Sequence, residues 1–122
     1  MSQQAKDIET DYAEMEASHT FDGYQDFTDT TAIYPPAKAL EYLALGLTSE
    51  AGEVAGKIKK YIRDGTALDH DAVVAELGDV LWYIAQFASA FDIYLSDIAE
   101  ENVNKLKDRQ KRNVIQGSGD NR

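Results

Sequence analysis

Four acidic residues fall in two pairs whose spacing could support metal chemistry. Glu50 and Glu53 are three residues apart, and so are Glu76 and Asp79. Residues three apart project from the same face of a helix, with Cβ atoms about 5–6 Å apart. At about 100° per residue, both pairs border the apolar stripe of their own segment. If the two segments form antiparallel helices, the four carboxylates converge beside the core.

A divalent cation would stabilise such a cluster. Close carboxylates repel one another, and partial burial raises the free energy of each charge further. Mg²⁺ takes oxygen ligands and is commonly held by a few carboxylates, waters and the oxygens of a substrate phosphate. It also polarises phosphoryl oxygens and lowers the pKa of a bound water. The acidic constellation therefore points to Mg²⁺ as cofactor and to phosphate chemistry on a nucleotide.

The alternative is a solvated helix surface. Acidic residues three apart are common there, and Glu53 could form an ordinary ion pair with Lys57 four residues later. Glycines inside the same segments favour the metal interpretation, because each costs about 1 kcal/mol relative to alanine in a helix. A close helix approach, or room for metal and substrate, would explain them. These glycines are Gly46, Gly52, Gly56 and Gly78.

Basic residues extend the same picture towards a phosphate ligand. Lys57 continues the face that carries the first acidic pair. Near the C-terminus, Asn102, Lys105 and Arg109 share one helical face and could contact phosphate oxygens. The alternative is a solvated helix in which Glu101 pairs with Lys105.

Aromatic and amide side chains near the N-terminus could line a base pocket. Tyr24, Gln25 and Tyr34 are the candidates, although aromatic residues at such spacing also fit a plain core. His19 and His70 lie outside the acidic constellation, and we assign them no role.

The two acidic pairs need two neighbouring helices to bring them together. An apolar stripe at helical period predicts the first helix from about Pro36 to Arg63. Proline can open a helix, and Gly65 can end this one in the left-handed conformation. The next helix should begin near Asp69 or Asp71, either of which can act as N-cap. We expect the two helices to pair antiparallel.

Shorter helices should flank this pair. One is expected from residue 22 or 23 to about 32, and the last over about 96–112 with Ser96 as its N-cap. No segment alternates like a strand, so the expected fold class is all-α, a four- to five-helix antiparallel bundle. The helix that carries Trp82 and Tyr83 is apolar on nearly every side. One side should pack within the chain and another against a second subunit, giving an oligomer.

Length and composition restrict the remaining possibilities. The 122 residues suit one domain, and the net charge of −10 disfavours polymeric nucleic acid or an anionic membrane as partner. Without cysteine, disulfides and thiolate sites are excluded. No secretory or membrane-spanning segment is evident, so a cytoplasmic location is expected. We divide the chain into an acidic extension with a weak helix or a mobile tail (1–20), a helical domain (21–113) and a flexible tail (114–122).

Two motifs resemble those of a known family. Residues 44–53 read ALGLTSEAGE and residues 76–83 read ELGDVLWY, with NVNKL downstream at 102–106. Together they are similar to the MazG-type nucleotide pyrophosphohydrolases of the all-α NTP pyrophosphatase superfamily, which also contains the dimeric dUTPases. The family pattern is E-x-x-E followed, after a gap, by E-x-x-D. The resemblance covers about residues 22–113.

The resemblance implies Mg²⁺-dependent hydrolysis of a (deoxy)nucleoside triphosphate to the monophosphate and pyrophosphate. It implies that Glu50, Glu53, Glu76 and Asp79 hold the metal. Glu50 or Glu53 would also act catalytically by orienting or deprotonating the attacking water. The implied substrate-binding residues are Lys57, Asn102, Lys105 and Arg109, with Gln25 added from the possible base pocket.

The resemblance also bears on assembly and leaves alternatives open. Short single-domain forms occur in bacteria and phages, as dimers or tetramers whose sites can draw residues from more than one subunit. The base is not fixed, and an effect on the alarmone ppGpp is conceivable for some members. One alternative is a dUTPase-like or dCTPase-like enzyme of the same superfamily. Another is a non-catalytic helical oligomerisation module.

Overall fold

The structure is a computed structural model that describes residue 2 and residues 17–122. The weak helix or mobile tail expected at the N-terminus lies mostly outside these residues. Every regular element in the described part is helical, which confirms the all-α class. None of the helices found there is both long and apolar enough to cross a membrane.

The longest helix, α3, carries the first acidic pair. The chain enters it through one 3₁₀ turn, Pro36–Lys38, and continues as α3 over Ala39–Asp64. Gly65 ends the helix with φ of 62°, and its N–H donates to the Tyr61 carbonyl at 3.1 Å. The predicted left-handed glycine is therefore confirmed, and only the first turn differs from the expected α-helix.

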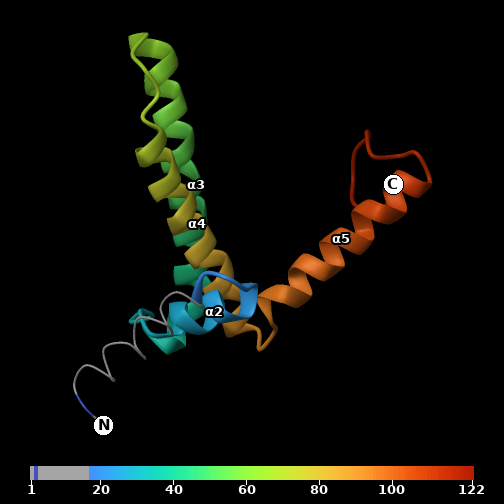
Figure 1. The fold of residues 1–122 in the computed structure, drawn as a ribbon, viewed down its shortest axis with the longest axis horizontal. Coiled ribbons are helices and arrows are strands. Elements are labelled where there is room, and N and C mark those ends of the chain that lie inside the picture. The colour runs from blue at the N-terminus through green and yellow to red at the C-terminus, as the bar shows by residue number, and fades with distance from the viewer. Residues whose placement is uncertain (1, 3–16) are drawn as a thin grey trace.

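Helix α4 spans His70–Ala90 and carries the second acidic pair. Asp69 is its N-cap, because the Asp69 carboxylate accepts the Ala72 N–H at 3.0 Å. The helix runs antiparallel along α3, as expected (Figure 1). Among residues 17–122 the buried apolar core is small, and its four members are Leu43, Ala85, Ala88 and Leu95.

A short helix, α2, fastens the start of the last helix, α5. Helix α2 spans Phe21–Asp29, three residues shorter at its end than expected, and α5 spans Leu95–Lys111. The predicted N-cap role of Ser96 is wrong, since Ser96 lies inside the first turn. Its N–H and hydroxyl instead donate to the Asp22 carboxylate at 3.1 and 2.9 Å. An acid from another helix thus caps α5 and complements its positive dipole end.

The expected bundle does not close within one chain. Helix α5 leaves the α3–α4 pair at the base and points away from it (Figure 1). It contacts α2 and α4 but, among the described residues, not α3. The reason is the turn between α4 and α5, where Asp92 adopts φ of 56°, together with the contacts that fix the start of α5 to α2.

The last nine residues fold back over the end of α5 (Figure 1). Asn113 reverses the chain with φ of 58°, and Gly117 and Gly119 adopt φ of 133° and 83°. The Arg122 guanidinium donates to the Val114 carbonyl at 3.3 Å, which closes the loop. The segment has a defined arrangement here, and its flexibility stays a prediction.

Candidate metal and nucleotide site

Three carboxylates from the two long helices meet at one point. One oxygen each from Glu50, Glu76 and Asp79 lies within 4.8 Å of the other two. Glu50 and Glu76 are partly buried and Asp79 is exposed, so the group lies at the edge of the α3–α4 interface. Carboxylate oxygens are the donors that Mg²⁺ takes in proteins, so these three side chains would be the ones to hold such an ion. The donor set is therefore suited to a hard divalent cation.

Electrostatic repulsion within the group falls mainly on Glu50. Burial raises the pKa of Glu50, and the neighbouring charges of Asp79 and Glu76, a hydrogen bond to Glu76 and the charge of Glu53 raise it further. A raised carboxyl pKa means that the ionised form is disfavoured in the folded protein. A bound cation would reverse this penalty, because it favours the charged carboxylates.

Glu53 does not join the three converging carboxylates. It is exposed on α3 at the edge of the group, close enough for its charge to act on Glu50. The expected convergence of four acids is thus seen for three of them. An acid beside the ligand group, open to solvent, is well placed to contact a water molecule.

Lys57 reaches the acidic group from α3. Its ammonium nitrogen lies 3.7 Å from a carboxylate oxygen of Glu76 on α4. The alternative of an ordinary Glu53–Lys57 surface pair is not the arrangement seen. Lys57 therefore belongs to the predicted site, as a cation that partly neutralises it.

Sequence reasoning missed the contribution of Tyr83 to the site. A Cβ at Gly46 would lie within 2.7 Å of three carbons of the Tyr83 ring, so only glycine admits the ring there. Burial, with hydrogen bonding to Tyr42 and the charges of Tyr42, Glu50 and Asp79, raises the pKa of Tyr83 to about 12. The signal was available in the pairing of an in-helix glycine with an aromatic residue on the neighbouring helix.

The candidate base-pocket residues occupy separate places. Tyr34 stacks on Tyr42 at a centroid distance of 5.2 Å and donates a 2.7 Å hydrogen bond to Gln86. Tyr24 lines a different cavity of about 600 Å³, together with Leu81. Burial raises the pKa of Tyr24, with a smaller contribution from the charge of Asp79. Of the three candidates, Tyr24 is the one whose hydroxyl lies close enough to Asp79 for its charge to act on it.

Gln25 has a structural position instead. Its side chain donates to the Ser89 hydroxyl at 3.1 Å and to the Ile93 carbonyl at 2.9 Å. Its amide oxygen accepts the Leu95 N–H at 2.7 Å. With only 6% of its surface exposed, Gln25 is fully used in joining α2 to the α4–α5 turn. We therefore leave Gln25 out of the substrate site.

The basic residues of α5 lie away from the acidic group of their own chain, because α5 diverges from the α3–α4 pair (Figure 1). Asn102 is exposed on this helix. Lys105 and Arg109 both contact Asp120 of the C-terminal segment, at 3.6 and 3.2 Å, rather than Glu101. One chain alone does not bring these residues to the carboxylates.

The fold and the site define an all-helical protein with a carboxylate group suited to a divalent cation. Residues 38–114 match the family described as the MazG nucleotide pyrophosphohydrolase domain. The chain is also 49% identical over 111 residues to the Gene 37 protein of Mycobacterium phage L5, covering 83% of this chain and 97% of that protein. The chain therefore belongs to the MazG family, which confirms the resemblance. No solved structure matches it.

Proposed function

We propose that this protein is a Mg²⁺-dependent pyrophosphohydrolase that cleaves a (deoxy)nucleoside triphosphate to the monophosphate and pyrophosphate. Membership of the MazG family supports nucleotide hydrolysis in general. The observation that carries the finer proposal is the convergence of Glu50, Glu76 and Asp79 from two helices. These three carboxylates would hold Mg²⁺, which polarises phosphoryl oxygens and acidifies bound water when present.

Glu53 is the proposed general base. It lies beside the metal-binding carboxylates without belonging to them, and its side chain faces solvent. A carboxylate in that place can accept a hydrogen bond from a water and take its proton as the water attacks phosphorus. Glu50 is the second candidate for this role, because it belongs to the same acidic pair on α3 and lies within the carboxylate group.

Lys57 is the proposed phosphate-binding residue of the same chain. Its contact with Glu76 is 3.7 Å long, which is a weak, partly exposed ion pair. An incoming triphosphate offers a higher negative charge than that one carboxylate. The ammonium group can therefore turn towards the substrate while Glu76 turns towards the metal.

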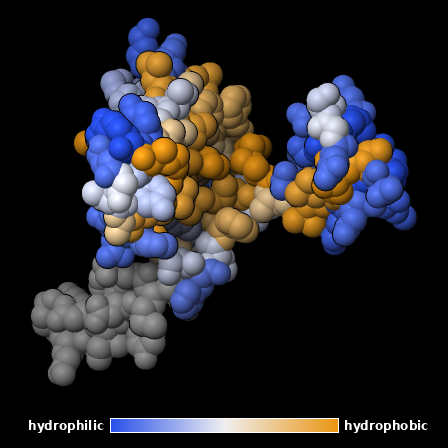
Figure 2. Space-filling view, turned by 90° about the horizontal axis from the view of Figure 1, so that it is seen from above, coloured by the Kyte–Doolittle hydropathy of each residue, from blue (hydrophilic) through white to orange (hydrophobic). Residues whose placement is uncertain are grey.

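The protein is proposed to act as a homodimer or homotetramer. Within the described part of the chain, four apolar residues are buried, whereas nineteen large ones are exposed. Apolar surface follows the side of the α3–α4 pair that faces α5, and the facing side of α5 itself (Figure 2). Exposed members on these helices are Val74, Leu77, Leu81, Ile98, Val103 and Leu106. Exposed apolar surface on two facing helical parts of a chain is typical of a subunit interface.

Assembly would also complete the site. Asn102, Lys105 and Arg109 project from a helix that leaves its own acidic group, so their proposed phosphate contacts require a second chain. Tyr24 and its cavity would receive part of the nucleoside, beside Asp79. The identity of the base is left open, because the cavity is lined both by apolar side chains such as Leu81 and by polar ones such as Ser96.

A substrate panel tests the proposal. The purified protein is incubated with each canonical dNTP and NTP, and with dUTP, in the presence of Mg²⁺. Monophosphate and pyrophosphate are the expected products, whereas orthophosphate would refute the proposed bond cleavage. Activity confined to dUTP or dCTP would favour the narrower enzymes of the superfamily. Absence of turnover together with absence of a Mg²⁺-dependent thermal shift would favour the oligomerisation module.

A further inference from the structure

Arg109 is a buried cation whose hydrogen-bonding capacity is only partly used. The residue has 5% of its surface exposed, although it lies near the end of a helix that projects from the molecule. One terminal nitrogen donates to the carbonyl and the carboxylate of Asp120 at 2.9 and 3.2 Å. The neighbouring Nε of the same guanidinium is buried and has no hydrogen-bond partner among residue 2 and residues 17–122. Such an atom is costly to bury and indicates an incomplete site.

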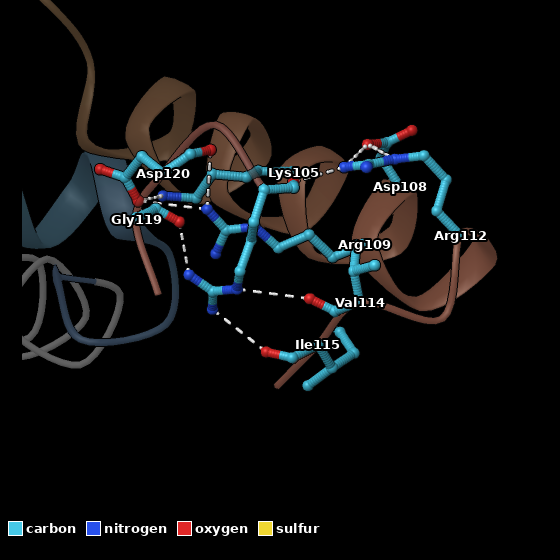
Figure 3. A network of polar contacts seen from close by, with 9 residues as sticks. Lys105, Asp108, Arg109, Arg112, Val114, Ile115, Gly119 and Asp120 are labelled. Atoms are coloured by element: carbon cyan, nitrogen blue, oxygen red, sulfur yellow. Dashed lines mark hydrogen bonds and ion pairs between the residues drawn. The ribbon is translucent and has the colours of Figure 1, made fainter. Parts of the chain in front are cut away.

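The group opposite this guanidinium is an anion of the chain itself. The Asp120 carboxylate also lies 3.6 Å from the Lys105 ammonium, so two cations converge on it (Figure 3). The Arg109 hydrogen bond and the charges of Lys105 and Arg109 lower the pKa of Asp120, which keeps it ionised. The side chain of Asp120 is 84% exposed, and ion pairs to such exposed carboxylates are weak. Another anion can therefore replace Asp120 beside Arg109.

The C-terminal segment is built to present this carboxylate. Gly117 and Gly119 adopt positive φ angles, and Arg122 donates to the Ile115 carbonyl at 3.1 Å. The Arg112 guanidinium donates to the Arg122 carbonyl at 2.7 Å, which ties the last residue to α5. These contacts form a loop that closes over the Arg109 side chain (Figure 3). We call residues 114–122 the C-terminal loop.

We propose that Asp120 occupies the phosphate-binding pair Lys105 and Arg109 of the proposed function as an internal competitor of phosphoryl groups. A phosphate oxygen pair fits the guanidinium fork by accepting from Nε and a terminal nitrogen together. Asp120 uses the terminal nitrogen but leaves Nε unpaired. A polyphosphate would therefore satisfy the site more completely, and its binding would displace the C-terminal loop.

The consequence for catalysis rests on the proposed function. If the partner chain's nucleotide reaches Lys105 and Arg109, then the C-terminal loop must open before its phosphates bind. The apparent affinity for a polyphosphate is then reduced by the fraction of molecules whose loop is closed. The loop would act as a substrate-displaced latch.

Inorganic pyrophosphate is the probe that tests the latch. Its affinity for the intact protein is measured by calorimetry in EDTA, so that neither the metal site nor hydrolysis contributes. Asp120→Asn should lower the dissociation constant about five- to tenfold, because the competing charge is gone. The matched control is Glu100→Gln, which removes one negative charge from the exposed surface of α5. Lys105→Gln should weaken binding in either background.

A labelled loop gives an independent measurement. The chain contains no cysteine, so Ser118→Cys provides one attachment point for a fluorophore. Pyrophosphate should displace the loop and so make the label more mobile. The fluorescence anisotropy should therefore fall over the concentration range in which pyrophosphate binds.

Three results would overturn the latch. They are pyrophosphate binding without loss of anisotropy, equal affinities of the Asp120→Asn and Glu100→Gln proteins, and no binding by wild type and Asp120→Asn alike. Failure of nucleotide hydrolysis would leave these metal-free measurements, and so the latch itself, unaffected.

Discussion

Tyr83 on α4 lies directly against Gly46 on α3, and its ring fills the place where any other residue would have a Cβ atom. The contact lies beside the carboxylates, since the charges of Glu50 and Asp79 act on the Tyr83 hydroxyl. It therefore sets how closely the two helices approach at the level where their acidic residues meet. The metal geometry depends on this glycine as much as on the ligands.

Gly46→Ala should disturb the site without touching a ligand. The added methyl group must displace the Tyr83 ring, and such overpacking destabilises by about 1–3 kcal/mol. Denaturant unfolding measures this loss, and Mg²⁺ affinity should fall with it. Gly52→Ala is the control, because apart from the neighbouring backbone of α3 no atom of the described residues lies within 4 Å of a Cβ placed at Gly52. That change should stabilise by up to about 1 kcal/mol. Equal stability of the two variants would contradict the close-contact account.

Glu50 should make the metal-free protein less stable as the pH rises. Its pKa is raised in the folded state, so its contribution to stability is complete below the unfolded pKa of about 4.3. The contribution is lost as the pH rises through the folded pKa. Urea unfolding in EDTA between pH 4 and pH 8 should therefore show a steeper decline for wild type than for Glu50→Gln.

The order of stability of wild type and Glu50→Gln should reverse when Mg²⁺ is added. At neutral pH in EDTA, Glu50→Gln should be the more stable protein, because it lacks the partly buried charge that Asp79 and Glu76 repel. With Mg²⁺, wild type should gain stability while the variant gains little. A variant that is less stable than wild type in EDTA at neutral pH would show that the raised pKa is not the controlling factor.

Substitutions at Glu53 and Asp79 should separate the loss of the chemical step from the loss of Mg²⁺ binding. Glu53→Gln should lower kcat by about 100- to 10,000-fold while keeping the Mg²⁺-dependent thermal shift, because Glu53 lies outside the ligand group. Asp79→Asn should lose both. Steady-state kinetics and thermal unfolding with and without Mg²⁺ make the comparison. Loss of the thermal shift in Glu53→Gln would instead make it a ligand.

A mixing experiment should reveal a site shared between chains. Asp79→Asn damages the acidic group and Lys105→Gln damages α5, and each should be inactive alone. Suppose that each site of a dimer combines the acidic group of one chain with α5 of the other. Random mixing of the two variants then gives one intact site in each mixed dimer, which is about a quarter of all sites. Mixing Lys105→Gln with Arg109→Gln is the control and should restore nothing. No recovery in the first mixture would place all functional residues within one chain.

The sequence was sufficient for the parts of the fold that local rules determine. The left-handed Gly65 and the Asp69 cap are confirmed because each depends on residues within one helical turn. The approach of Glu50, Glu76 and Asp79 follows from helix periodicity and one antiparallel contact, and both were accessible to inspection.

Polar contacts between residues far apart in the chain could not be predicted from the sequence in the same way. The start of α5 is bound by Asp22 and Gln25, which precede it by about 70 residues in the chain. Hydrophobic periodicity does not predict a polar contact of this kind. The direction of α5 follows from it, and with it the separation of Arg109 from the acidic group. Gln25 could look like a substrate ligand only because its three partners are invisible in the sequence.

The most direct test is ³¹P NMR of one reaction, with nucleoside triphosphate and Mg²⁺, for wild type and Asp79→Asn. The account predicts that wild type produces nucleoside monophosphate and pyrophosphate in equal amounts, and that the variant, although folded, produces neither. Orthophosphate and nucleoside diphosphate from wild type, or undiminished turnover by Asp79→Asn, would contradict the proposed role of the three converging carboxylates.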